Sequence, residues 1–178
     1  MRTTTQLGRL GLGTVAVYAG LGVLHLLVLN PLAAVPGVGL GSIYDRVHQA
    51  GVTMGVTLAV LWALVLIGLS GAAWWQVRRP GASTGTQVLM ANLALVVLGA
   101  PSLFVVSFWS GMSLADTFGI SGGDHAPWAR VLYLVSALAA LGFLWIAVMR
   151  RRSADPTATE GEDAVPFTSH EGSWSSDT

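Results

Sequence analysis

The chain has no cysteine and no lysine, and only 10% of its 178 residues are charged. Without cysteine, disulfides, thiolate metal sites and thiol catalysis are all excluded. A soluble globular protein carries about 25% charged residues, so this chain has too few ionised groups to cover its surface in water. Hydrophobic residues make up 53% of the sequence, and the scarcity of charge is explained if most of the surface faces lipid.

Four apolar stretches are long enough to cross a membrane, which takes about 20 apolar residues in a helix. They run over residues 10–29, 50–75, 87–109 and 128–149, in each case approximately. Each stretch is apolar around its whole circumference, which is typical of a span rather than a surface helix. The sequence therefore predicts an all-α fold, a polytopic membrane protein whose residues 1–152 form a four-helix transmembrane bundle.

Arginine placement predicts the orientation of these spans. Seven arginines flank the spans on one side, and only Arg46 and Arg130 fall on the other. The positive-inside rule places the arginine-rich side in the cytoplasm. We therefore expect a multi-pass protein of the cell membrane with both termini cytoplasmic. A signal peptide is the alternative interpretation of the first stretch, but its run of about 20 apolar residues exceeds the usual h-region of about 7–15.

Residues 153–178 differ sharply from the rest of the chain. This stretch holds six acids, no arginine and many serines and threonines. Low hydrophobicity combined with net negative charge predicts a disordered cytoplasmic tail.

Local sequence signals predict where the spans end and how they are connected. Asn30-Pro31 is expected to end the first span, because proline cannot continue a helix. Ser42 is a candidate N-cap, with Asp45 at N3, so the second span's helix is expected to begin above the membrane. Gly51-x-x-x-Gly55 is interpreted as a small-residue helix face, used for internal packing first and for dimerisation second. Residues 110–127 are expected to form the second outer loop.

His25 is the most informative single residue, because it lies inside the first span. Ionisable groups at that depth suggest a functional site. A neutral histidine can also be held by a hydroxyl on a neighbouring helix, and structural packing is the favoured interpretation over a ligand or proton role. The candidate partners are Ser102, Ser107, Thr53 and Thr57.

Haem and metal sites are weaker hypotheses. A bis-histidine haem needs two imidazoles at matching depth, and only His25 lies within a span; a pair of His25 and Met54 is the remaining option. Asp45 and His48 share one helical face at i, i+3. Asp124 and His125, with Asp116, could approach them from the other outer loop and complete a metal site. Ordinary interfacial polar residues are the favoured interpretation, and no cofactor is predicted.

Further polar residues lie within the predicted spans. Asn92, Tyr18 and Thr14 are expected to hydrogen-bond across helices, and Pro101 could break the third span and free a carbonyl at membrane depth. Together with His25, the residues Tyr18, Asn92 and Pro101 could line a polar path. The halves also share a rhythm, since Asp45 and His48 precede the second span as Asp124 and His125 precede the fourth. A two-helix repeat is a minor hypothesis.

Three functions compete. The leading hypothesis is a non-catalytic accessory or regulatory subunit that packs against another membrane complex. The alternative is a small transporter or export factor, working as a dimer, whose path contains His25, Tyr18, Asn92 and Pro101. A haem- or metal-binding redox protein built on the histidines comes third. The expected partners are the lipid bilayer and another membrane protein or a second copy of the chain, and no nucleic acid.

Overall fold

The computed structural model describes residues 2–79 and 84–154, and within these ranges the regular structure is entirely helical. Four of the helices are long and apolar enough to cross a membrane, as predicted. The elements are α1 (Arg2–Leu24), the π-helical turn η1 (His25–Leu29), α2 (Asn30–Ala34), α3 (Leu40–Gln49), α4 (Val56–Val77), α5 (Gly85–Phe118) and α6 (Trp128–Ala154).

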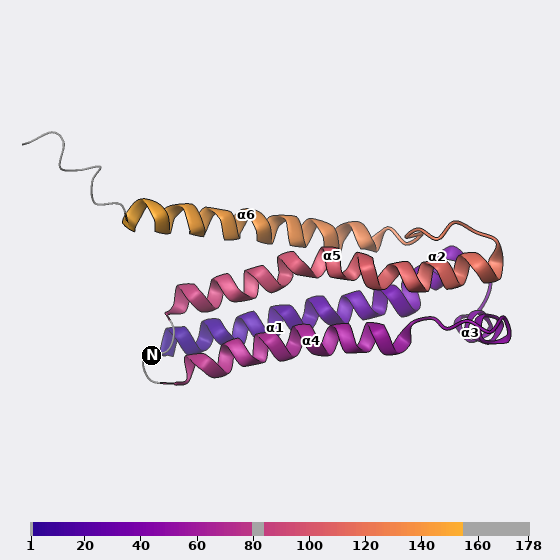
Figure 1. Ribbon diagram of the computed structural model, residues 1–178, viewed down its shortest axis with the longest axis horizontal. Helices are drawn as coiled ribbons and strands as arrows, with labels where there is room; N and C mark the ends of the chain where they lie inside the picture. The colour runs from indigo at the N-terminus through magenta and orange to yellow at the C-terminus, as the bar shows by residue number, and fades with distance from the viewer. Residues whose placement is uncertain (1, 80–83, 155–178) are drawn as a thin grey trace, which may run out of the picture.

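The long helices lie side by side in an elongated bundle (Figure 1). α1 packs against α4 and α5, whereas α6 packs mainly against α5. The buried core between them includes Val15, Leu26, Trp62 and Leu103. We term the end where α1 begins and α6 ends the terminal end, and the opposite end, which carries α3 and residues 119–127, the loop end.

Arginines gather at the terminal end of the bundle. The start of α1, the end of α4 and the end of α6 all lie there (Figure 1). These segments carry the seven arginines that the sequence assigns to one side: Arg2, Arg9, Arg78, Arg79, Arg150, Arg151 and Arg152. The first two residues of the predicted tail, 153 and 154, belong to α6. The Ser153 hydroxyl donates to the carbonyl of Met149 at 3.0 Å. Residues 155–178 of the tail lie outside the described part.

The first span does not end at Asn30-Pro31, as the sequence predicted, but continues to Ala34. A π turn precedes the proline, and the Asn30 N–H donates to the carbonyl of His25. Pro31 has no N–H to offer the carbonyl of Leu27, four residues earlier. The Tyr44 hydroxyl of α3 donates to that carbonyl at 2.9 Å. A tertiary contact thus provides a donor at the position where the proline cannot.

α3 is a separate helix and not an extension of the second span. Its N-cap is Gly39, without a side-chain bond, so the predicted cap at Ser42 is wrong. Gly51 and Gly55 have φ values of +74° and +66°, a left-handed conformation that ends a helix and favours glycine. They lie in the break between α3 and α4 and form no helix face, which overturns the predicted GxxxG packing surface.

α5 is longer than predicted and takes up half of the expected second outer loop. It starts at a capping box, in which Thr84 and Gln87 bond reciprocally, and it ends where Gly119 adopts φ +66°. Its 34 residues reach about 51 Å at 1.5 Å per residue, well beyond a hydrocarbon core of about 30 Å. The helix runs through Pro101 without a break, which contradicts the break expected there.

Candidate functional site

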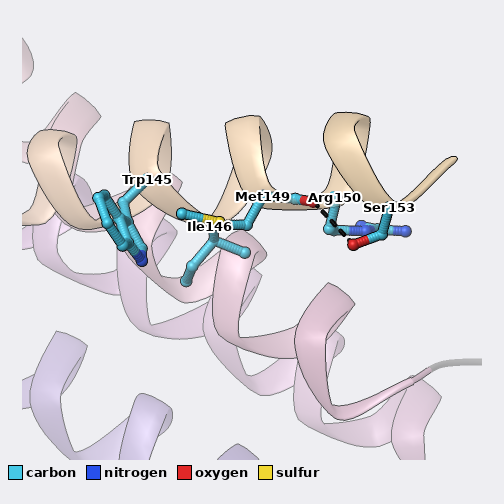
Figure 2. A pocket seen from close by; sticks show the side chains of 5 residues that line it. All are labelled: Trp145, Ile146, Met149, Arg150 and Ser153. Carbon is cyan, nitrogen blue, oxygen red and sulfur yellow. Dashed lines mark hydrogen bonds between the residues drawn. The ribbon is translucent and has the colours of Figure 1, made fainter. Parts of the chain in front are cut away.

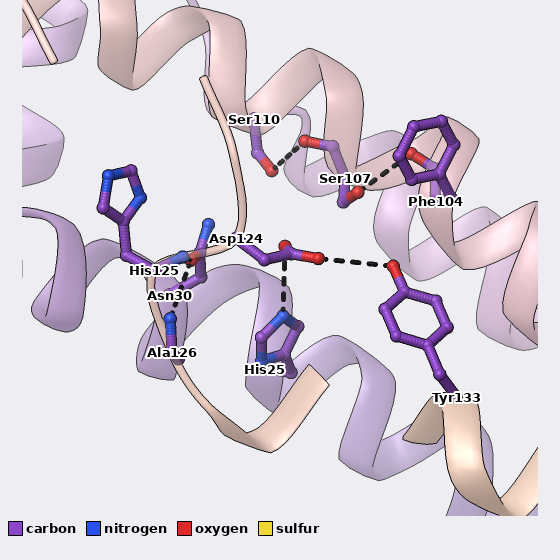
Figure 3. Close-up of polar contacts among 9 residues, drawn as sticks. All are labelled: His25, Asn30, Phe104, Ser107, Ser110, Asp124, His125, Ala126 and Tyr133. Carbon is purple, nitrogen blue, oxygen red and sulfur yellow. Dashed lines mark hydrogen bonds and ion pairs between the residues drawn. The ribbon is translucent and has the colours of Figure 1, made fainter. Parts of the chain in front are cut away.

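The candidate site lies at the loop end, where α1, α6 and residues 119–127 meet around His25. The imidazole begins the π turn and is only 1% exposed. Its Nε2 lies 3.4 Å from Oδ1 of Asp124, which comes down from the loop (Figure 3). The other carboxylate oxygen accepts a hydrogen bond from the Tyr133 hydroxyl of α6 at 3.2 Å. Asp124 therefore joins the first and the last span.

The charge state of Asp124 sets the roles of its neighbours. The hydrogen bond from His25 lowers the pKa of the Asp124 carboxyl below its ordinary value, against the effect of burial, and Tyr133 and the charge of His125 add to the lowering. An ionised carboxylate only accepts hydrogen bonds, so Nε2 of His25 carries the proton that faces it. The other ring nitrogen, Nδ1, is buried and has no hydrogen-bond partner in the described part of the chain.

Asn30 holds the backbone of the same loop. Its side chain is 1% exposed, and its Oδ1 accepts from the backbone N–H of His125 at 2.7 Å and of Ala126 at 3.4 Å (Figure 3). One buried acceptor thus satisfies two loop donors. We refer to His25, Asn30, Asp124 and Tyr133 as the loop-end cluster.

α5 comes so close to this loop that only glycine fits. A Cβ at Gly111 would collide with the backbone carbonyl of Gly122. The nearby hydroxyls of Ser107 and Ser110 bond to carbonyls of their own helix, at 2.8 Å and 3.0 Å. The absence of a side chain at Gly111 therefore allows residues 119–127 to pack closely against α5.

The hydroxyl partners that the sequence suggested for His25 are wrong. Ser102 accepts a hydrogen bond from the Trp62 indole at 2.9 Å, and Ser107 bonds within α5. The sequence places Asp124 in the second outer loop and offers it only as a metal ligand, so its contact with His25 was not predicted. The signal that was missed is the glycine-rich stretch 119–123, which lets the chain fold back over the end of the bundle.

The predicted metal ligands are not brought together. Asp45 and His48 are exposed on α3, whereas Asp124 bonds to His25 and His125 lies 3.2 Å from the Ser121 hydroxyl. Within residues 2–79 and 84–154, no three His, Cys, Asp or Glu side chains gather to hold a metal. Met54, proposed with His25 as a haem ligand, packs instead in the apolar cluster beneath α3.

Other polar residues within the candidate spans form cross-helix contacts at two further levels. Tyr18 and Ser136 pair at 2.9 Å between α1 and α6; because Ser136 donates to the carbonyl of Val96 at 2.8 Å, Tyr18 is the donor to Ser136. Nearer the terminal end, the Ser70 hydroxyl donates to the Asn92 side chain at 2.6 Å, from α4 to α5.

Thr14 and Pro101 both lie on the exposed sides of their helices. Thr14 is exposed and donates within its own helix to the carbonyl of Leu10 at 3.0 Å, so the predicted cross-helix bond is wrong. Pro101 lies on the exposed side of α5.

Comparison of the chain with protein-family models, curated proteins and solved structures finds no match.

Proposed function

We propose that the chain is a multi-pass protein of the cell membrane that acts as a non-catalytic accessory or regulatory subunit of a membrane complex. Four candidate spans support insertion. The arginines at the terminal end support a cytoplasmic location for both termini, by the positive-inside rule. The protein's role is to pack against a partner rather than to transform a substrate.

The observation that carries this proposal is the incomplete packing of α6. Only 17% of its most apolar window is buried, against 33% for the first span and 28% for α5. Four large side chains, Leu134, Leu138, Leu141 and Trp145, are each more than half exposed at helical spacing. Lipid can cover such a stripe as well as protein can, so the stripe alone does not require a partner.

The terminal half of α6 gives the stronger argument for a partner. A shallow surface hollow of about 390 Å³ there is lined entirely by α6 residues, from Trp145 to Ser153 (Figure 2). The polar bonds of α6 to the bundle, made by Tyr133 and Ser136, lie in its loop half. Towards the terminal end, Arg150 makes only a weak contact with Met90 of α5, at 3.5 Å. A helix fixed along one half suits the docking of a partner helix along the other.

Substitution on α6 tests this proposal against a matched position. Leu144, in the terminal half of α6, and Leu64 of α4 are each 58% exposed. We expect the protein, expressed at native level and purified in mild detergent, to be recovered with one partner in a fixed ratio, measured by native mass spectrometry. Leu144→Trp should lose that partner and Leu64→Trp should keep it. A partnerless monomer, or equal behaviour of the two variants, would contradict the proposal.

A small transporter is the second candidate, favoured by the spacing of polar groups along α1. His25, Tyr18 and Gly11 are seven residues apart and so share one helical face, and Gly11 lies against Asn92. A cavity of about 270 Å³ between α1 and α5 reaches Asn92. Proton flux into proteoliposomes, followed with a trapped pH dye, tests this path. Flux that is unaltered in both His25→Ala and Asn92→Ala would remove it.

A further inference from the structure

A groove separate from the loop-end cluster opens between the α3–α4 break and the projecting part of α5. Its volume is about 760 Å³, and its lining includes Thr53, Thr57, Trp109, Ser113 and Asp116. The Ser113 hydroxyl donates to the carbonyl of Thr53 at 2.7 Å. This bond ties the break to α5 and gives the groove a fixed wall.

Two side chains supply the chemistry of the groove. Trp109 and Asp116 are seven residues apart, so both stand on one face of α5, about 10 Å apart along the axis. Trp109 is 62% exposed, which leaves much of its indole open. Asp116 makes no hydrogen bond or ion pair with any residue in the described ranges.

The groove contains no positive group of its own. None of its lining residues is an arginine or a histidine. Arg46, the cation of the adjoining α3, lies instead over the ring of Phe118, 5.9 Å from its centroid. An aromatic face beside an unpaired carboxylate attracts a cation with apolar substituents, and an ammonium group has this character.

The depth of the groove relative to the bilayer indicates which kind of molecule supplies that ammonium group. α4 has 22 residues and a length of about 33 Å, so Val56, its first residue, lies near one boundary of a hydrocarbon core of about 30 Å. The groove is lined by residues on both sides of Val56 and thus lies at headgroup depth. We propose that it binds the ammonium headgroup of an aminophospholipid such as phosphatidylethanolamine. This inference rests on the membrane insertion proposed above, but not on the partner subunit.

Native mass spectrometry in detergent with added phosphatidylethanolamine or phosphatidylglycerol of equal chain length tests the proposal. We expect the protein to retain the ethanolamine lipid preferentially. Trp109→Leu should reduce that preference about two- to fivefold, which corresponds to a cation–π contact at an exposed site, and Asp116→Asn should reduce it at least as much.

Matched controls are available on the same end of the molecule. Trp128→Leu removes another interfacial tryptophan, 59% exposed, and Asp45→Asn removes another exposed acid; neither residue lines the groove, so the preference should persist in both. All four variants change exposed side chains, and circular dichroism verifies that each keeps its helical content.

Three outcomes would overturn the assignment. The first is equal retention of the two lipids by the unmodified protein, and the second is an equal loss of preference in Asp45→Asn and Asp116→Asn. The third is saturation of the groove by free ethanolamine, measured by saturation-transfer NMR, with no preference between lipids. The partner experiment is scored separately, because Leu144 does not line the groove, so either proposal can fail alone.

Discussion

The two ends of the bundle are held by different kinds of contact. At the loop end, Asp124 joins α1 to α6 through His25 and Tyr133. Nearer the terminal end, the buried polar pair of Ser70 and Asn92 joins α4 to α5 and does not involve α6. The hollow on α6 at this end is lined by residues of α6 alone. Directional polar bonds therefore position α6 at one end, while at the other its place depends on apolar contact that lipid or a partner can replace.

Removal of the central imidazole should have the largest effect on this contrast. We expect His25→Ala to lower the free energy of unfolding by about 3 kcal/mol, because it creates a cavity and leaves the Asp124 carboxylate without the N–H of His25. Unfolding in detergent, followed by circular dichroism, measures the change. His48→Ala is the control, since His48 is exposed on α3 and should cost less than about 0.5 kcal/mol. Equal losses in the two variants would remove the loop-end cluster as the stronger attachment.

The second largest loss of stability is expected from over-packing of the contact between α5 and residues 119–127. Gly111→Ala places a methyl group against the backbone carbonyl of Gly122, which cannot rotate away, so we expect a cost of about 2 kcal/mol. The amides of residues 119–127 should exchange faster with deuterium, while those of α4 should not change. Gly13→Ala is the matched control, because its new Cβ meets no atom within 4 Å. Unchanged exchange in Gly111→Ala would show that the loop is not seated by α5.

Acid should weaken the loop end selectively. His25 lowers the pKa of the Asp124 carboxyl below its ordinary value of 3.8. The ionised form therefore stabilises the fold fully above pH 3.8, and this contribution is lost as the pH falls through the lower pKa of the folded state. We expect Asp124→Asn to be less stable than the unmodified protein at pH 7, by about 1 kcal/mol, and the gap to close in acid. A gap that stayed constant down to pH 3 would assign the stabilisation to another group.

The sequence predicts the parts of this fold that depend on solvent. Low charge and the lengths of the apolar stretches identify all four candidate spans, because a lipid core imposes the same requirement on any helix that crosses it. The cross-helix contacts of Asn92 and Tyr18 also follow. A polar group inside a span must find an internal partner, and few are within reach.

Features that depend on tertiary contact were not predictable from local patterns. Asn30-Pro31 has the pattern of a helix end, but a donor from Tyr44, which lies in another helix, compensates the carbonyl that the proline leaves free. Similarly, His25 pairs with Asp124, 99 residues away, because a glycine-rich loop folds back over the bundle. Gly51 and Gly55 show the converse: their spacing resembles a packing motif, but their left-handed φ values end a helix.

The terminal end should respond least to loss of a polar bond. Ser70→Ala removes one hydrogen bond to Asn92 and should cost about 0.6 kcal/mol, the average found for such bonds in a membrane protein. Because the hydrogen bond of Ser70 goes to Asn92 of α5, the spacing of α6 from α1 should not change. Since the chain has no cysteine, spin labels at Leu10→Cys and Trp145→Cys report that spacing without background. Ser136→Ala is the contrast, because Ser136 bonds to both Tyr18 and Val96, and its loss should broaden the measured distances. Broadening of the distances by Ser70→Ala would show instead that the bond between α4 and α5, and not the loop half of α6, controls the spacing of α6 from α1 at the terminal end.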